Sequence, residues 1–156
     1  AWTVRKLVAG LLAVGAAVGL AGCAQALVVE AAPYAGDPGC ARVMLAMPPV
    51  VGGLDVRGTT SQATAAYGTE FPIVVRCGVE PPGPTTDSCV SIEADGGAQD
   101  WVVSEADGWW RAVSFGRSPA VEVLIPTARA QEAVGEVLAE VSGPAALAPG
   151  NGLECT

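Results

Sequence analysis

The sequence contains no histidine, and its only lysine is Lys6, close to the N-terminus. Without histidine, the chain can form neither a Ser-His-Asp nor a Cys-His catalytic pair, and it can form no histidine-ligated metal site. If the N-terminal end is removed, no lysine remains for a P-loop or a Schiff base. The chemistry left to the protein is that of carboxylates, hydroxyls, arginines and thiols.

Charged residues are also scarce, at 15% of the 156 residues, and most of them are acidic. The 16 Asp and Glu residues outnumber the 8 Lys and Arg residues, which gives a formal charge of −8. We expect no binding to nucleic acid, because Lys and Arg contacts to phosphate supply most of that affinity. A hydrophobic content of 51% argues against intrinsic disorder. The length fits one domain, since domains commonly have roughly 100–200 residues.

The N-terminus has the order of a secretory signal, with the basic residues Arg5 and Lys6 before an apolar run, 7–20. The run ends in Leu-Ala-Gly-Cys at 20–23, which resembles the lipobox of bacterial lipoproteins. This resemblance predicts removal of residues 1–22 as a signal peptide and a diacylglycerol on the thiol of Cys23. Plain secretion is one alternative. An uncleaved membrane anchor is another, because the apolar stretch 7–24 is near the lower limit of about 17 residues for a helix that spans a membrane.

Residues 23–39 contain Pro33, Gly36, Pro38 and Gly39 and show little periodicity, so we expect a tether there. Residues 40–156 are expected to form a single globular domain. Two acyl chains hold a protein firmly on a membrane, and no polybasic patch is present to assist them. We therefore expect an exported protein, anchored through its lipid to the outer face of the cytoplasmic membrane.

Four cysteines follow Cys23, at positions 40, 77, 89 and 155. An even number in an exported domain indicates two disulfides, whereas the spacing does not fit zinc. Of the three possible pairings we favour Cys77–Cys89, which closes a proline-rich loop, and Cys40–Cys155, which joins the ends of the domain. Free buried cysteines remain an alternative.

The hydrophobic pattern predicts a short helix over 40–47 and a second, amphipathic helix that Thr127 caps and Gly143-Pro144 ends. Asp107-Gly108 is typical of a type I′ hairpin turn. Strands are predicted at 72–77, 89–94, 100–105, 109–115 and 120–125. The predicted fold class is α+β, an antiparallel sheet of about five strands with a short N-terminal helix and a C-terminal amphipathic helix on one face.

Two sequence blocks, Arg76-Cys77-Gly78-Val79 and the run Gly-Arg-Ser-Pro-Ala-Val-Glu-Val at 116–123, give the chain a family likeness. Over 37–126 it resembles an uncharacterised actinobacterial family of small exported proteins, a domain of unknown function. The resemblance implies export or membrane attachment and supplies no activity.

Arg76 and Glu122 each interrupt an otherwise apolar strand, and buried charges need partners. We predict a cross-strand ion pair between them. The alternative is a site for an anionic ligand on Arg76 or Arg117.

Glu93, Asp95 and Asp100 lie close together in the sequence. They could form a calcium loop or a carboxylate pair for glycoside hydrolysis, although a solvated turn is the simpler interpretation. Three hydroxyl residues are poor candidates for a nucleophile, because no base is available to activate them: Thr85, Ser114 and Ser118.

The predicted hairpin holds all three tryptophans that follow the signal peptide. Strand alternation places Trp101 and Trp110 on one face and Trp109 with Arg111 on the other. We expect Trp101 and Trp110 in the core. Trp109 and Arg111 are then the candidate binding surface.

These features predict a non-catalytic cell-envelope lipoprotein, without cofactor or metal, that binds a protein partner or an envelope component such as a glycan. The alternative hypothesis is a carboxylate-based hydrolase that acts on cell-wall material. Two carboxylates facing each other across a deep cleft would favour the hydrolase, and a shallow surface with exposed aromatics would favour binding.

Overall fold

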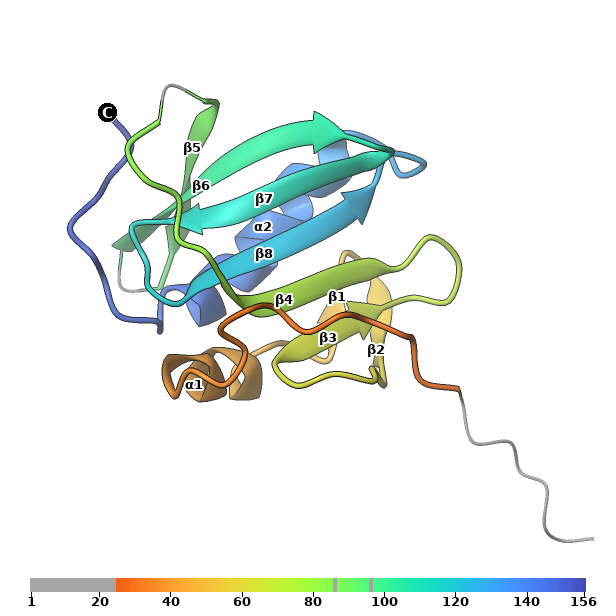
Figure 1. Ribbon diagram of the computed structural model, residues 1–156. Coiled ribbons are helices and arrows are strands. Elements are labelled where there is room, and N and C mark those ends of the chain that lie inside the picture. The colour runs from red at the N-terminus through yellow and green to blue at the C-terminus, as the bar shows by residue number, and fades with distance from the viewer. Residues whose placement is uncertain (1–24, 86, 96) are drawn as a thin grey trace, which may run out of the picture.

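The computed structural model describes residues 25–85, 87–95 and 97–156. The predicted signal peptide and the predicted lipidation site at Cys23 lie outside these residues. Two helices and eight strands follow one another along the described chain (Figure 1). They are α1 (Gly39–Leu45), β1 (Val50–Val51), β2 (Leu54–Arg57), β3 (Thr64–Tyr67), β4 (Ile73–Val79), β5 (Cys89–Ala94), β6 (Gly97–Ala106), β7 (Trp109–Phe115), β8 (Ala120–Pro126) and α2 (Glu132–Ala145).

The strands form one antiparallel sheet in the order β1-β2-β3-β4-β8-β7-β6-β5. Two meanders, β1 to β4 and β5 to β8, therefore meet where β4 pairs with β8 (Figure 1). The chain crosses from the centre of the sheet to its far edge between β4 and β5. This confirms the predicted α+β class with an antiparallel sheet.

The predicted number of strands is wrong, because the sheet has eight strands rather than about five. The five predicted strands correspond to β4 through β8. The three missed strands are only two to four residues long. Such short segments show no alternating pattern, and their pairing depends on the central strand β4, against which β3 is aligned.

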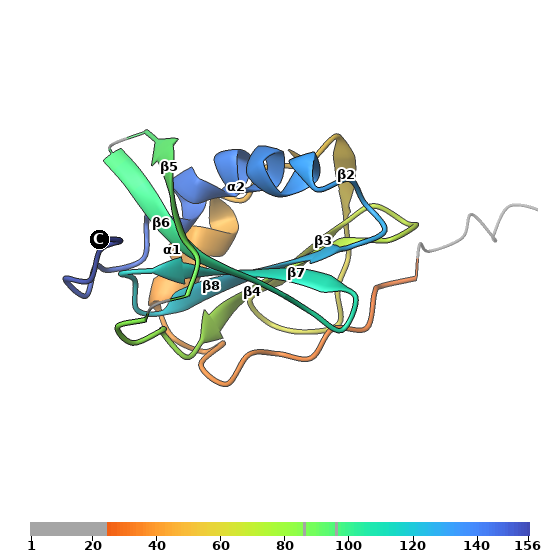
Figure 2. The same ribbon diagram turned by 90° about the horizontal axis from the view of Figure 1, so that it is seen from above.

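The molecule has three layers, with α2 above the sheet and an extended chain below it (Figure 2). The sheet face toward α2 is apolar, and α1 contributes to the same core. Helix α2 begins at Glu132, later than expected from Thr127, and it continues through Pro144 to Ala145 instead of ending at Gly143-Pro144. It buries Val137, Leu138 and Val141. The indole Nε1 of Trp101 donates a hydrogen bond to Ser142 Oγ at 2.9 Å, which joins α2 to β6 within this core.

The opposite face of the sheet is crossed by residues 25–38, which we call the N-terminal segment (Figure 1). We expected a tether there, but the segment packs on the domain. The backbone N–H of Leu27 donates to Gly58 O at 2.9 Å, and that of Tyr34 donates to Gly78 O at 2.8 Å. Ala32 is buried with Val79 and other apolar side chains in a small second cluster. The tether prediction failed because prolines and missing periodicity also describe an extended chain that is held by its neighbours.

The structure pairs all four cysteines that follow Cys23, but not as predicted. The disulfides are Cys40–Cys77, between α1 and β4, and Cys89–Cys155, between β5 and the C-terminal tail. The predicted Cys77–Cys89 bond is wrong because β4 and β5 are four strand positions apart, about 19 Å. A disulfide requires a Cα–Cα separation below about 7 Å. The predicted Cys40–Cys155 bond is also wrong, because Cys40 pairs with Cys77 and Cys155 pairs with Cys89.

Candidate functional site

A buried carboxylate between two arginines lies on the sheet face opposite α2. Glu122 is only 2% exposed, and its Oε1 accepts from Arg76 Nε at 2.7 Å. Its Oε2 accepts from Arg111 Nε at 2.6 Å. Strand register explains the first contact, because Arg76 and Glu122 are direct partners across β4 and β8. The predicted ion pair is confirmed.

The sequence reasoning missed Arg111 as the second partner of Glu122. The sequence did contain a sign of this contact, because strand alternation places Arg111 and Trp109 on the same face of β7. Arg76 also contacts the N-terminal segment, because its Nη1 donates to Glu30 O at 3.2 Å. Both oxygens of Glu122 therefore accept hydrogen bonds from arginines within the fold.

Arg117, the other candidate for anion binding, supports the C-terminal tail. Its Nε donates to Gln99 Oε1 at 3.0 Å, and its Nη1 donates to Ala148 O at 2.9 Å. Gln99 is buried and donates in turn to Phe115 O at 3.2 Å. This arrangement holds the chain after α2 against the end of β7.

The three clustered carboxylates do not form a common site. Asp100 Oδ2 accepts the backbone N–H of Cys155 at 2.7 Å, so this carboxylate fixes the tail beside the second disulfide. Glu93 and Asp95 are exposed near the end of β5. Within residues 25–85, 87–95 and 97–156, no three His, Cys, Asp or Glu side chains are grouped as metal ligands.

The hydroxyl candidates also have structural partners or lie in solvent. Ser114 is buried, and its Oγ accepts the backbone N–H of Val121 at 2.8 Å. Thr85 Oγ1 accepts the backbone N–H of Asp87 at 3.0 Å. Ser118 is exposed.

The hairpin of β6 and β7 has the predicted register, with Glu105 opposite Trp110 and Ala106 opposite Trp109. Trp101 is fully buried, as expected, whereas Trp110 is only partly buried against the same core. Trp109 is half-buried rather than exposed. Among the aromatic residues that the structure describes, the exposed ones are Tyr34 and Phe71. A binding role for Trp109 and Arg111 stays a prediction.

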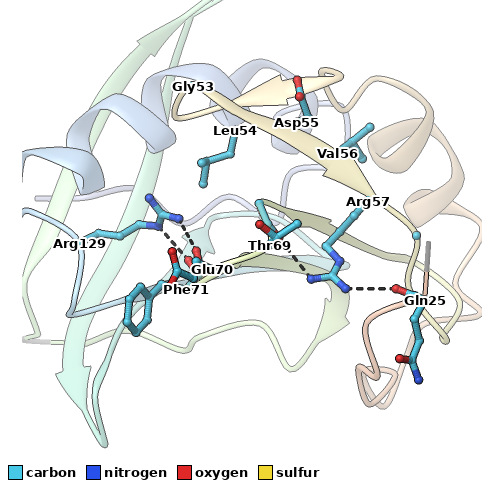
Figure 3. Close-up of a pocket in the computed structure, with 12 residues that line it drawn as sticks. Gln25, Gly53, Leu54, Asp55, Val56, Arg57, Thr69, Glu70, Phe71 and Arg129 are labelled. Carbon is cyan, nitrogen blue, oxygen red and sulfur yellow. Dashed lines mark hydrogen bonds between the residues drawn. The ribbon is translucent and has the colours of Figure 1, made fainter. Parts of the chain in front are cut away.

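An open groove of about 1020 Å³ lies between β2, the turn from β3 to β4, and the loop from β8 to α2 (Figure 3). Gln25, the first described residue, lines its rim. No sequence pattern predicts this groove, because its walls are β2 and loops that are distant in the sequence. Its lining residues are Gln25, Gly53, Leu54, Asp55, Val56, Arg57, Gly58, Gly68, Thr69, Glu70, Phe71 and Arg129.

Two arginines hold the walls of the groove together by donating to backbone carbonyls (Figure 3). Arg57 Nη2 donates to Gln25 O at 3.1 Å. Arg129 donates through Nε to Phe71 O and through Nη2 to Glu70 O, both at 2.9 Å. Among the described residues, the salt bridges formed all involve Glu122. The positive charges of Arg57 and Arg129 are therefore not neutralised by a bonded carboxylate.

Phe71 is the exposed aromatic of the groove, with 58% of its surface accessible. Its φ angle of 48° lies in the left-handed region, which is uncommon for a bulky residue and costs on the order of 1–3 kcal/mol. The bond from Arg129 to its carbonyl oxygen fixes this conformation. The turn thus presents an apolar ring to solvent at a local cost in free energy.

Comparison with known proteins gives one family match. Residues 4–148 match a family described as "Protein of unknown function (DUF3515)". No curated protein and no solved structure matches the chain. Within the part of the chain that the structure describes, no helix is both long and apolar enough to cross a membrane.

Proposed function

Since the chain belongs to the DUF3515 family, whose description assigns no activity, we propose its function from the sequence and the arrangement of its side chains. We propose a non-catalytic lipoprotein that is exported and anchored through Cys23 to the outer face of the cytoplasmic membrane. Its domain binds a protein partner or a component of the cell envelope there.

The observation that carries this proposal is the pairing of the cysteines. All four cysteines after Cys23 form disulfides, which persist in exported proteins and are rare in the reducing cytosol. Their loops span 37 and 66 residues, and the loop-entropy relation gives each about 4 kcal/mol of stabilisation. Cys23 is then the one cysteine left for acylation, and it stands at the end of the Leu-Ala-Gly-Cys sequence.

The positions of the carboxylates support a binding role over hydrolysis. Glu122 is held by two arginines, and Asp100 accepts a hydrogen bond from the backbone of the C-terminal tail. A glycosidase needs one carboxyl group as general acid and a second as base or nucleophile, placed across the scissile bond. Neither of these two carboxylates is available for such a role without loss of a structural contact.

The test of anchoring is the substitution Cys23→Ala in the producing cell. We expect the parent protein to sediment with membranes and to carry the mass of a diacylglycerol, and the variant to lose both properties. Gln25→Ala, which leaves the lipobox intact, is the matched control and should behave like the parent. A parent protein without lipid mass, or a Cys23→Ala variant that fractionates like the parent, would contradict the proposal.

A separate assay tests the catalytic alternative. Purified parent protein should release no soluble fragments from cell-wall glycan. Release that disappears in both Glu93→Gln and Asp100→Asn, with unfolding temperatures unchanged, would favour the hydrolase instead.

A further inference from the structure

We propose that the groove end of the domain rests directly on the phospholipid bilayer, with Phe71 in the interface and with Arg57 and Arg129 against headgroup phosphates. This inference rests on the proposed acylation of Cys23. It adds an orientation and a lipid-contacting surface to that function.

The first step is the length of chain between the lipid and the fold. Gln25 is already bonded to the domain, because its carbonyl oxygen accepts from Arg57 Nη2. One residue, Ala24, lies between Cys23 and Gln25. Two successive Cα–Cα steps span at most about 7 Å. The headgroup layer on each side of a bilayer is about 5–8 Å thick. A domain tied this closely to an acylated cysteine cannot stand away from the membrane.

The second step is which part of the domain lies at this point. The N-terminal segment enters at the end of the molecule that carries the turn from β3 to β4 and the loop from β8 to α2, as both views show (Figures 1 and 2). The C-terminal end of α2 and the C-terminus lie at the opposite end. The groove formed by that turn and that loop therefore faces the bilayer.

The third step is the chemistry of the groove surface that faces the bilayer. Phe71 and Val56 are exposed apolar side chains on the groove, 58% and 50% accessible. Phenylalanine is among the apolar side chains that membrane-surface segments bury at the boundary between headgroups and acyl chains. The guanidinium groups of Arg57 and Arg129 are held in place by carbonyl oxygens and have no bonded carboxylate among the described residues. Arginine forms strong charge-assisted hydrogen bonds to phosphate oxygens.

Long-range attraction to an anionic membrane does not explain the contact. After loss of residues 1–22 the chain keeps all 16 acidic residues and only six arginines. Asp55 and Glu70 also line the groove and oppose a purely electrostatic attraction. The acyl anchor must therefore supply the proximity, and the local side chains set the orientation.

The backbone at Phe71 gives independent support for a role in contact. Asparagine and glycine adopt a left-handed φ more readily than phenylalanine. An exposed phenylalanine at this position gains little from the fold, since more than half of its surface is in solvent. Contact with the lipid interface would compensate for the strain.

The experiment uses the acylated full-length protein on vesicles of phosphatidylcholine and phosphatidylglycerol in equal parts. The four downstream cysteines are paired and Cys23 is acylated, so an added cysteine is the one free thiol for a nitroxide label. Thr69→Cys places the label at the groove, and Leu147→Cys places it just beyond the C-terminal end of α2. Collision with a water-soluble paramagnetic reagent is measured for each label by electron paramagnetic resonance.

We expect the label at position 69 to be several-fold less accessible to the water-soluble reagent than the label at position 147. Adding Phe71→Asn should bring the accessibility at position 69 close to that at position 147, while the protein still sediments with vesicles. Leu45→Asn, which removes an apolar side chain 88% exposed on α1, is the matched control and should change neither value. The unfolding temperature of Phe71→Asn should equal or exceed that of the parent, which excludes a loss of fold.

Equal accessibility of the two labels in an acylated, vesicle-bound parent would overturn this inference and leave the proposed anchoring intact. The inference would also be overturned if the two labels differed in accessibility as much in the Phe71→Asn variant as in the parent. A parent that carries no lipid and does not sediment would instead refute the proposed function on which the inference rests.

Discussion

The two faces of the sheet bury their side chains in different ways. The face toward α2 is covered by a helix with an apolar stripe, and its polar contacts include the hydrogen bond from Trp101 to Ser142. The other face is covered by an extended chain, and it contains a carboxylate between two arginines. A helix satisfies its own backbone hydrogen bonds, whereas an extended segment must find partners on the domain.

This difference between the two faces explains the structural role of one of the two sequence blocks that give the chain its family likeness. The residues of Arg76-Cys77-Gly78-Val79 serve both faces: Cys77 bonds to α1 in the helix-side core, whereas Arg76 serves the other face. Val79 also serves that other face, because the strand register shifts between Cys77 and Val79. Gly78 lies where the N-terminal segment crosses β4. The residues of this block are accounted for by folding, without reference to catalysis.

The largest effect is expected on the helix-covered face. Trp101→Ala should lower the free energy of unfolding by about 3–5 kcal/mol, because it opens a cavity in the core and leaves the hydroxyl of Ser142 without its donor. Urea unfolding followed by circular dichroism measures the change. Val90→Ala, at an exposed position on the edge strand β5, should cost far less. Equal losses for the two variants would mean that the core is not centred beneath α2.

On the opposite face, Glu122→Ala should cost about 2–4 kcal/mol, because it leaves two arginines without their shared carboxylate. A double-mutant cycle with Arg76→Ala and Arg111→Ala separates the two pairs. The coupling should be larger for Arg76, whose side chain is 21% exposed, than for Arg111, at 47%. A larger coupling for Arg111 would contradict the burial of this cluster beneath the N-terminal segment.

Gly78→Ala tests the contact between that segment and the sheet. Gly78 has a φ of 100°, and an added Cβ would lie 2.4 Å from the carbonyl carbon of Tyr34. We expect a loss of about 2–3 kcal/mol and faster proteolysis of residues 25–38. Gly83→Ala, where an added Cβ meets no atom within 4 Å, is the matched control and should be nearly neutral. Stability of Gly78→Ala equal to the control would show that the segment does not cross there.

The smallest effect concerns Tyr67, whose hydroxyl donates to Pro48 O at 2.8 Å. Burial, with a further contribution from Glu140, raises the pKa of Tyr67 above its ordinary value of 10.0. Its stabilising contribution is therefore complete below pH 10.0 and is lost as the pH rises through the higher folded-state value. Tyr67→Phe should cost about 1 kcal/mol at neutral pH and reduce the alkaline loss of stability. An unchanged alkaline profile would contradict the burial of this hydroxyl.

Sequence patterns were sufficient for local features such as the hairpin at Asp107-Gly108 and the amphipathic character of α2. The ion pair of Arg76 with Glu122 could also be predicted, because each charge interrupts an otherwise apolar strand. Other partners that are distant in the sequence could not be predicted. The disulfide pairing depends on β4 and β5 lying on different sides of β8, and the groove depends on Arg129 reaching the turn at Glu70 and Phe71.

The N-terminal segment is the clearest example of this limit. Its prolines and glycines are typical of a tether, yet its buried alanines and backbone hydrogen bonds make it the third layer of the domain. The same composition is compatible with both states, and partners on the domain, such as the acceptors at Gly58 and Gly78, distinguish them.

Hydrogen–deuterium exchange of the full-length protein tests this layer most directly. The amides of Leu27 and Tyr34, which donate to Gly58 and Gly78, should be protected to a degree comparable with amides of β4. Exchange of both amides at the rate of an unstructured chain would show that residues 25–38 form a tether. It would also remove the close link between the anchor and the groove.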